Sequence, residues 1–459
     1  MDDYQAFLAA KAPRGLKRGL HSTPQLSSWL SPTQRHCVEF ALAIGSSLCA
    51  LDTGIGKTGV ELEFSEHARH ASNGKALILT PLAVAKQFER EGKRFGYDAF
   101  VIRDQSEARA GINICNYDRL HLLDAAEFGS VCLDEAALIK NFSGKVSRSL
   151  INAFAHHRWR LPATATPAPN SHMEMGQYAE FCGIMQSNEM LSRFFINDTA
   201  QASQEWRLKR YGVEAFWDWI ASWSRVAQLP SDLGFDDTGY ILPPIEVIQH
   251  RAAESAPTLT GGLFGDEIVS ATNMHTIKRA TANKRAGIAA ALAMSNSEPW
   301  CIWCDTDYES DEVMKALGKN SEAVEVRGSM DADKKERHLE MFADGTARII
   351  VTKPVLAGHG LNWQHCARTT FVGRSFSYQN WYQAVRRFWR FGQTRQVQVH
   401  LVVAEGEDSI SRVIDRKADD HAEMKTAMRA AMRRANGQES ARRVAYKAGK
   451  KGTLPKWIA

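Results

Sequence analysis

Residues 52–58 read Asp-Thr-Gly-Ile-Gly-Lys-Thr, a glycine-bearing turn followed by a lysine and a hydroxyl side chain. The glycines let the backbone curl so that successive N–H groups face phosphate oxygens, and the start of a following helix adds a positive dipole end. Lys57 would supply a mobile cation, and Thr58 a hydroxyl ligand for Mg²⁺. The usual phosphate loop has a glycine five residues before Gly56, where this chain has Leu51. The pattern predicts a triphosphate site, with a plain strand-to-helix turn as the alternative.

Two adjacent acids, Asp134 and Glu135, follow the apolar run 131–133. A buried strand that carries both to its C-terminal edge would let Asp134 hold Mg²⁺ while Glu135 polarises the attacking water. Neighbouring side chains point to opposite sides of a strand, so the two acids can hold separate roles. Capping of the next helix is the alternative. Beside the turn at 54–58, we favour the catalytic interpretation.

Arg387 and Arg390 stand three residues apart, on one face of an expected helix. Guanidinium groups presented by a neighbouring domain can neutralise the charge that develops during phosphoryl transfer. A solvated basic helix is the alternative. The flanking Trp381, Phe388 and Trp389 indicate instead that this helix is largely packed.

These residues need elements that bring them to one sheet edge. Residues 46–164 alternate short apolar runs with amphipathic stretches, and the runs at 76–79, 100–102, 112–115 and 131–133 predict strands. A helical pattern covers 83–95. Such alternation indicates βαβ units and a parallel sheet, whose ligands bind at the carboxyl ends of the strands.

A second series of strands is predicted at 300–303, 323–326, 348–352, 369–372 and 397–403. Between the two series, residues 172–229 are helical in pattern and rich in tryptophan, which favours a packed helical hairpin over a base-stacking platform. We therefore predict an α/β protein with two parallel-sheet domains. The predicted divisions are a first domain over 1–171, a helical insertion and linker over 172–243, a linker and helical protrusion over 244–283, a second domain over 284–410, and a basic helical or flexible tail over 411–459.

The composition, with 44% apolar and 24% charged residues, is that of an ordinary globular protein. The chain has no apolar run of membrane-spanning length and its N-terminus lacks a signal pattern, so we expect a cytoplasmic protein. The eight cysteines lie mostly in apolar runs and are expected to be reduced core residues; the Cys301–Cys304 pair lacks a second pair for zinc. Basic residues crowd the C-terminal stretch, which suits a polyanion contact or a solvated tail.

The order of these segments resembles the superfamily-2 helicases. It is most similar to the Swi/Snf-type DNA translocases and their small phage-encoded relatives described as DEAD/DEAH-box helicases, and the resemblance covers about residues 30 to 405. It implies two RecA-like domains with ATP held between them. Residues 54–58 match the family's Gly-x-Gly-Lys-Thr, which also lacks a glycine at position 51. Ala137 stands where the family's Asp-Glu-Ala-His motif has histidine, and Arg386 where Swi/Snf proteins often have aspartate.

The resemblance implies a role for each matching residue. The catalytic residues are Lys57, Glu135, Arg387 and Arg390. The ATP contacts are Gln34, Gly54, Ile55, Gly56, Lys57, Thr58, Asp134, Gly360 and Gln383, with Mg²⁺ on Thr58 and Asp134. The nucleic-acid contacts are Thr80, Pro81, Asn116, Tyr117, Thr164, Thr166, Gly358 and Asn362, and coupling runs through Ala137, Thr164 and Thr166.

The function predicted from these features is a nucleic-acid-stimulated ATPase that uses ATP and Mg²⁺ and acts as a helicase or translocase. Double-stranded DNA is the favoured partner, and translocation is favoured over strand separation because no accessory wedge domain is evident. The alternatives are an RNA helicase or remodeller, a nucleic-acid-binding scaffold with a weak ATPase, and the motor subunit of a larger assembly.

Overall fold

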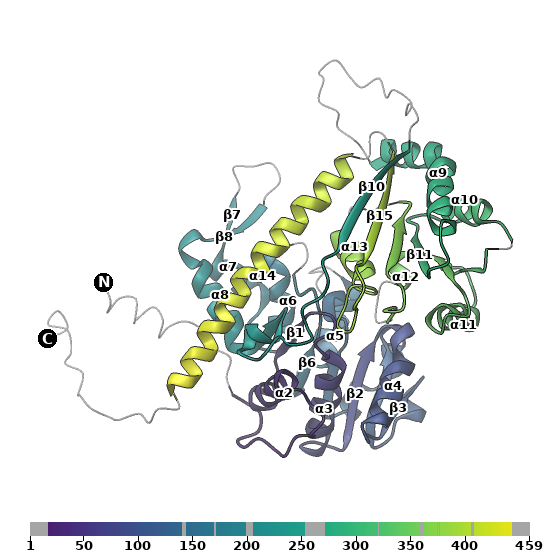
Figure 1. Cartoon of the computed structure of the whole chain (residues 1–459). Coiled ribbons are helices and arrows are strands. Elements are labelled where there is room, and N and C mark those ends of the chain that lie inside the picture. The colour runs from purple at the N-terminus through teal and green to yellow at the C-terminus, as the bar shows by residue number, and fades with distance from the viewer. Residues whose placement is uncertain are drawn as a thin grey trace, which may run out of the picture.

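The computed structural model describes residues 17–139, 144–168, 171–198, 205–252, 271–319, 321–357, 362–373, 375, 377–404 and 408–442. Two parallel sheets, each flanked by helices, dominate these residues (Figure 1). The prediction of an α/β fold with two RecA-like domains is therefore confirmed.

The first sheet has the strand order β3-β4-β2-β5-β6, and every neighbouring pair is parallel. Its strands are β2 (Lys75–Thr80), β3 (Ala99–Val101), β4 (Gly111–Asn116), β5 (Ser130–Leu133) and β6 (Trp159–Pro162). Strand β1 (Leu48–Leu51) runs beside β6, with single-residue parallel bridges from Ser46 to Arg160 and from Cys49 to Ala163, and it pairs in parallel with β9 (Ser224–Ala227). Strand β9 thus pairs with a strand of the first domain, although its residues lie in the range 172–243 that the sequence predicts to be a helical insertion and linker.

The helices of the first domain cover this sheet. They are α2 (Pro32–Ile44), α3 (Lys57–His70), α4 (Ala85–Arg94) and α5 (Lys145–Ala153), with 3-10 turns η1 (Leu82–Val84), η2 (Gln105–Glu107), η3 (Tyr117–Leu122), η4 (Ala125–Glu127) and η5 (Ala136–Ile139). Helix α2 begins at a capping box in which Ser31 and Gln34 satisfy each other's backbone N–H groups, with proline at the first helical position.

The tryptophan-rich insertion packs onto the first domain. It consists of η6 (His172–Glu174), α6 (Met175–Phe181), α7 (Ser187–Phe194), β7 (Phe195–Asp198), β8 (Glu205–Leu208), η7 (Arg210–Gly212), α8 (Val213–Trp223) and η8 (Pro230–Leu233). Trp219 and Trp223 on α8 are buried, and Trp219 stacks on Phe194 with ring centroids 5.2 Å apart. These rings belong to the first domain's hydrophobic core, as the packing interpretation of the tryptophans predicts.

The second sheet has the order β10-β15-β14-β11-β13-β12 and is also parallel. Its strands are β10 (Glu246–Ala252), β11 (Trp300–Trp303), β12 (Ala323–Glu325), β13 (Ile349–Thr352), β14 (Arg368–Phe371) and β15 (Gln398–Ala404). Its helices are α9 (Ala271–Met294), α10 (Asp307–Leu317), α11 (Ala332–Ala343), α12 (Pro354–Ala357) and α13 (Tyr378–Val385). The edge strand β10 lies in the range 244–283 that the sequence assigns to a linker.

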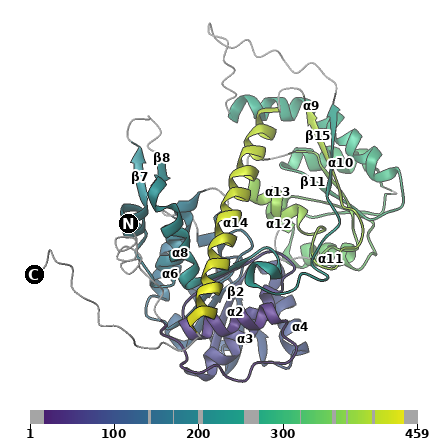
Figure 2. The same ribbon diagram turned by 60° about the vertical axis from the view of Figure 1, so that its left-hand side comes forward.

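The last helix, α14 (Asp408–Arg442), leaves the second domain and runs back along the first beside α8 (Figures 1 and 2). Its Met424, Met428 and Met432 are buried in the first domain's core. The part of the predicted tail that follows residue 442 lies outside the described residues.

All eight cysteines are buried and none forms a disulfide. Among the helices that the structure describes, none has the length and apolar character needed to cross a membrane.

Candidate active site

The phosphate turn joins the buried strand β1 to helix α3. Gly54 and Gly56 have φ angles of 94° and 93°, a left-handed conformation that favours glycine. Gly56 is the N-cap of α3, and no side chain caps the helix there. The first N–H groups of α3 therefore meet this turn without a capping side chain, which is the arrangement of an anion site. Ile55, between the glycines, is buried and anchors the loop.

Lys57 opens α3 and folds back over the turn, where its Nζ donates to the carbonyl oxygen of Leu51 at 2.8 Å. Burial lowers the pKa of this lysine, and the charges of Glu135 and Asp52 oppose that shift. Thr58 follows it, partly exposed, in the first turn of the helix.

Gln34 lies directly against the phosphate turn. Its Nε2 donates to the carbonyl oxygen of Gly56 at 3.0 Å, while its Oε1 accepts from the backbone N–H of Ser31 at 2.8 Å. The capping box of α2 therefore fixes the amide that the sequence predicts to read adenine.

The acid pair follows β5 at the carboxyl edge of the first sheet. The hydroxyl of Thr80, at the end of β2, donates to Asp134 Oδ2 at 2.8 Å, and the hydroxyl of Tyr117 donates to the Asp134 backbone carbonyl at 2.6 Å. Burial, and then the charge of Glu135, raises the pKa of Asp134 to about 6. Glu135 has a φ of 53°, an uncommon conformation for a residue with a side chain, and such outliers gather at functional sites.

Glu135 also contacts the second domain. Gln383 on α13 donates from Nε2 to Glu135 Oε1 at 2.6 Å, and the hydroxyl of Thr164 donates to the same oxygen at 3.5 Å. One carboxylate oxygen thus receives donors from both domains, and all three side chains are buried.

Arg387 and Arg390 lie just beyond the end of α13. The helix ends at Val385, so the two arginines occupy the following turn rather than the helical face that the sequence predicts. Arg387 Nε donates to the carbonyl oxygen of Gln383 at 3.2 Å. Burial, and then the charge of Arg390, lowers the pKa of Arg387 to about 9, against the opposing charges of Glu135 and Asp134. Arg387 is therefore a buried cation of the second domain that lies near both acids of the first, while Arg390 is partly exposed.

Several residues with predicted nucleic-acid contacts have buried side chains. Thr80, Thr164 and Thr166 are fully buried. The hydroxyls of Thr80 and Thr164 donate to Asp134 and Glu135, and the Thr164 hydroxyl accepts from the backbone N–H of Thr166. Asn116 accepts a hydrogen bond from the backbone N–H of Arg119 and so caps η3. Pro81 and Tyr117 are partly exposed, Asn362 is exposed, and Ala137 is buried in η5. Gly358 and Gly360 lie outside the described residues.

Two acids near the turn received no role from the sequence. Glu61, one turn after Lys57 on α3, is fully buried, and among the described residues neither of its carboxyl oxygens has a hydrogen-bond partner. Burial, and then the charge of Asp134, raises its pKa well above the usual value. The other acid is Asp52, which precedes the turn and contacts the second domain through Tyr382 and Arg386. The feature of the sequence that could have pointed to Asp52 is its position beside the glycine turn.

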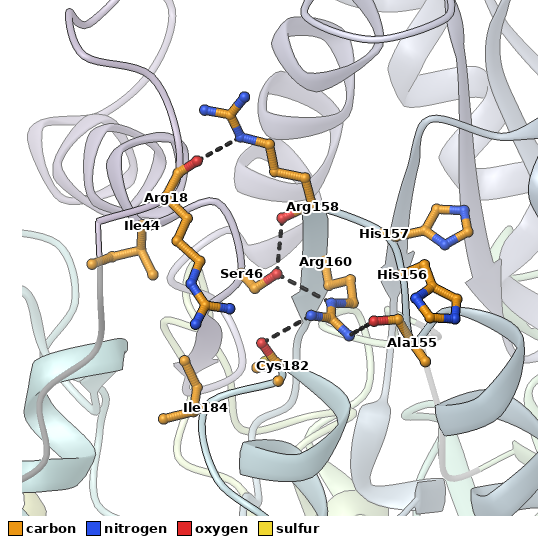
Figure 3. Close-up of a pocket in the computed structure, with 11 residues that line it drawn as sticks. Arg18, Ile44, Ser46, Ala155, His156, His157, Arg158, Arg160, Cys182 and Ile184 are labelled. Carbon is orange, nitrogen blue, oxygen red and sulfur yellow. Dashed lines mark hydrogen bonds between the residues drawn. The ribbon is translucent and has the colours of Figure 1, made fainter.

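A separate pocket of ≈ 390 Å³ lies at the opposite edge of the first sheet, near the starts of β1 and β6 (Figure 3). Arg18, Ser46 and Arg160 line it. Arg160 donates to Ser46 Oγ and to the carbonyl oxygens of Ala155 and Cys182, each at 3.2 Å. This arginine ties β6 to the chain after α6, and its pocket is no part of the site at the carboxyl ends of the strands.

Part of the chain is similar to known proteins. Residues 283–392 match the helicase conserved C-terminal domain. A Bacillus subtilis (strain 168) protein, YwqA, which carries the provisional name ATP-dependent helicase/translocase, is 26% identical over 181 residues. The aligned part covers 35% of this chain and 19% of that relative, so the chain spans about a fifth of the length of the relative it matches.

The fold and the site define a tandem of two RecA-like α/β domains whose polar residues meet at their interface. The matched domain and the relative support a superfamily-2 helicase.

Proposed function

We propose that this chain is an ATP-driven motor on nucleic acid, most specifically a translocase on double-stranded DNA. The observation that carries the proposal is the hydrogen bond from Gln383 to Glu135. It joins the acid pair of one domain to the arginine-bearing segment of the other. An ATPase built in this way completes its site only when the two domains are together.

The residues present fit ATP with Mg²⁺. The two left-handed glycines and the start of α3, which no side chain caps, form a cradle for phosphate oxygens beside Lys57. Thr58 and Asp134 offer the hydroxyl and carboxylate oxygens that Mg²⁺ prefers. When bound, the metal would supply positive charge to the phosphates.

Each residue then has a defined task in hydrolysis. Lys57 leaves its contact with the Leu51 carbonyl oxygen and binds phosphate. Glu135 orients and polarises the attacking water, and Gln383 holds its carboxylate in place. Arg387 and Arg390 stabilise the negative charge of the transition state from the second domain.

A direct route links the predicted nucleic-acid segments to this chemistry. The segments at Thr80–Pro81 and Asn116–Tyr117 both donate a hydrogen bond to Asp134. The hydroxyl of Thr80 contacts its carboxylate, and the hydroxyl of Tyr117 contacts its backbone carbonyl oxygen. A shift of either segment on a nucleic-acid backbone would move the proposed metal ligand. We therefore propose that nucleic acid stimulates hydrolysis through Asp134.

Duplex DNA is proposed as the track because the motif order resembles the Swi/Snf branch and its phage relatives, and the relative named above is called a helicase/translocase. Contacts with phosphates would make binding sensitive to salt and largely independent of sequence. An RNA remodeller, a scaffold with weak ATPase and a motor subunit of a larger assembly are the other outcomes of the test.

The test is ATP hydrolysis without nucleic acid and with single-stranded DNA, duplex DNA, forked DNA or RNA. We expect duplex DNA to raise turnover most, and Glu135→Gln to abolish hydrolysis while ATP is still bound. Triplex displacement without strand unwinding would support translocation. The motor proposal fails if no nucleic acid raises the rate or if Glu135→Gln hydrolyses ATP like the wild type.

A further inference from the structure

A buried carboxylate just before the phosphate turn is a meeting point of three parts of the chain. Asp52 follows β1, and the hydroxyl of Tyr382 on α13 lies 2.9 Å from each of its carboxylate oxygens. The backbone N–H of Thr53 donates to Asp52 Oδ1 at 2.7 Å. The carboxylate is thus held both by its own loop and by the second domain.

Two cations complete this group. Arg386 Nη2 lies 3.2 Å from Asp52 Oδ1 and donates to the carbonyl oxygen of Thr53 at 2.9 Å, and its Nε donates to the Thr53 hydroxyl. Lys425 on α14 lies 3.4 Å from Asp52 Oδ2 and donates to the Tyr382 hydroxyl at 3.0 Å. We call Asp52, Tyr382, Arg386 and Lys425 the Asp52 cluster.

Burial makes the cluster energetically consequential. The side chains of Asp52, Arg386 and Lys425 are each 7% exposed. Burial acts to raise the pKa of Asp52, but Arg386 and Lys425 outweigh it and hold this pKa far below the usual value. Removal of Asp52 would leave Arg386 and Lys425 buried without their counter-charge, which is strongly unfavourable, and removal of Arg386 would leave Asp52 with the more distant Lys425.

The position of the cluster in the chain matters as much as its burial. Asp52 lies two residues before Gly54, and Arg386 immediately precedes Arg387. A Cβ added to Gly54 would lie 2.6 Å from Phe391 Cβ, so the segment after α13 already lies directly against the turn. The ion pair between Asp52 and Arg386 therefore fixes the position of the segment that carries Arg387 and Arg390 relative to the phosphate turn.

Helix α14 holds the cluster from the side of the first domain. Met424 and Met428, next to Lys425 on this helix, are buried in the first domain's core. One helical turn further, Arg429 contacts the buried Asp232 through its Nε, 2.5 Å from Oδ1. The helix lies along the first domain in both views (Figures 1 and 2). The contacts of Lys425 with Asp52 of the first domain and Tyr382 of the second place this lysine at the interface.

We propose that Asp52, Arg386 and Lys425 are positioning residues that clamp the second domain onto the phosphate turn and so place Arg387 and Arg390 for ATP hydrolysis. The placement of the two arginines rests on the proposed function. The clamp also accounts for arginine at position 386, since an aspartate there would face Asp52 with a like charge.

The kinetic test uses Asp52→Asn, Arg386→Gln, the double variant and Arg386→Lys in the full chain. We expect each single neutral variant to lower kcat about tenfold or more while KM for ATP changes less than about threefold. The double variant should lose clearly less than the product of the two single losses, since both single variants remove the same ion pair. Arg386→Lys should recover part of the lost kcat, which a loss of packing alone would not predict.

Matched controls come from ion pairs outside the interface. Arg395→Gln removes a contact to Glu298 within the second domain, and Arg434→Gln removes the contact of α14 with Asp218. Both should keep kcat near the wild-type value, whereas Lys425→Met should lower it. The clamp is refuted if Arg386→Gln stays within about twofold of the wild type in kcat, or if the singles multiply in the double variant.

A second measurement does not depend on hydrolysis. Small-angle X-ray scattering of the nucleotide-free protein should show a larger radius of gyration for Asp52→Asn and Arg386→Gln, and an unchanged one for Arg395→Gln. If the wild type hydrolysed no ATP, the proposed function would fail while this comparison still tested the clamp. Equal radii in all proteins would refute it, and thermal melting identifies any variant that fails to fold.

Discussion

The hydrogen bond from Gln383 to Glu135 gives the most direct test of a site shared between the domains. Its length is 2.6 Å and both side chains are buried. A hydrogen bond to a charged group contributes about 1.5–3 kcal/mol. Gln383→Ala removes that donor from the second domain, so the equilibrium constant for bringing the two domains into contact should fall about 10–150-fold. We expect kcat to fall by a similar factor while the first domain still binds ATP.

The assay is steady-state ATP hydrolysis with saturating duplex DNA, together with equilibrium binding of a fluorescent ATP analogue. Gln398→Ala is a matched control, because Gln398 donates to the Glu246 carboxylate at 2.8 Å entirely within the second domain. That variant should keep its turnover. A role for this hydrogen bond in the shared site would be refuted if Gln383→Ala hydrolysed ATP as fast as the wild type, or if the two variants lost activity equally.

Three further predictions concern stability and the turn. Arg285→Met removes the guanidinium that lies 2.9 Å from the carboxylate of Glu309, where both side chains are fully buried. Urea unfolding should show that the free energy of unfolding of the second domain falls by about 3–5 kcal/mol. Lys315→Met, in an exposed pair on the helix that carries Glu309, should lower it by less than about 1 kcal/mol. Burial, and then the charges of His250 and Arg368, lowers the pKa of His400 to about 4. The folded state therefore binds fewer protons than the unfolded state between about pH 4 and 6.5, and stability is lost as the pH falls through that range. In urea titrations, the free energy of unfolding of His400→Gln should fall less between pH 7 and pH 5 than that of the wild type. Equal losses in the two proteins would contradict the assignment. Gly54→Ala places a side chain on a left-handed backbone, at a cost of about 1–2 kcal/mol, and brings its Cβ into collision with Phe391 of the second domain. This variant should therefore have a larger radius of gyration. Gly74→Ala is the control, because Gly74 also has a positive φ, +83°, but lies in open space, and its radius should not change.

The strands that hold the site were predictable because each is a short buried apolar run. Those at 76–79, 112–115 and 131–133, and all five expected in the second sheet, appear within a residue or two of the predicted bounds. Strand β10 was missed because its residues from Glu246 to Arg251 alternate between half-buried and exposed, the pattern of an edge strand with little apolar signal. Strand β9 was missed because it directly follows α8 in a helical stretch.

The contacts of Asp52 with Tyr382 and Lys425 could not be predicted, because they join residues 330 or more positions apart. Nothing in the spacing of Asp52, Tyr382 and Lys425 indicates that they meet. The methionines of α14 gave only a weak sign of burial within a strongly basic sequence, so the helix was predicted as a tail rather than as part of the first domain's core. Arg386 was visible as a departure from the Swi/Snf pattern, but its partner was not.

The separate roles of the two acids have a different physical origin from the one that the sequence predicts. Alternation along a strand would send Asp134 and Glu135 to opposite faces, yet β5 ends at Leu133 and both acids lie beyond it. The left-handed backbone at Glu135 separates them instead. As a result Asp134 receives donors from Thr80 and Tyr117 of its own domain, while Glu135 receives Gln383 from the other. Asp134 is therefore linked to the segments at Thr80 and Tyr117, while Glu135 is linked to the second domain through Gln383 and to its own domain through Thr164. Neither set of contacts uses the side chain at position 137, so the alanine that replaces the family's histidine leaves both connections in place.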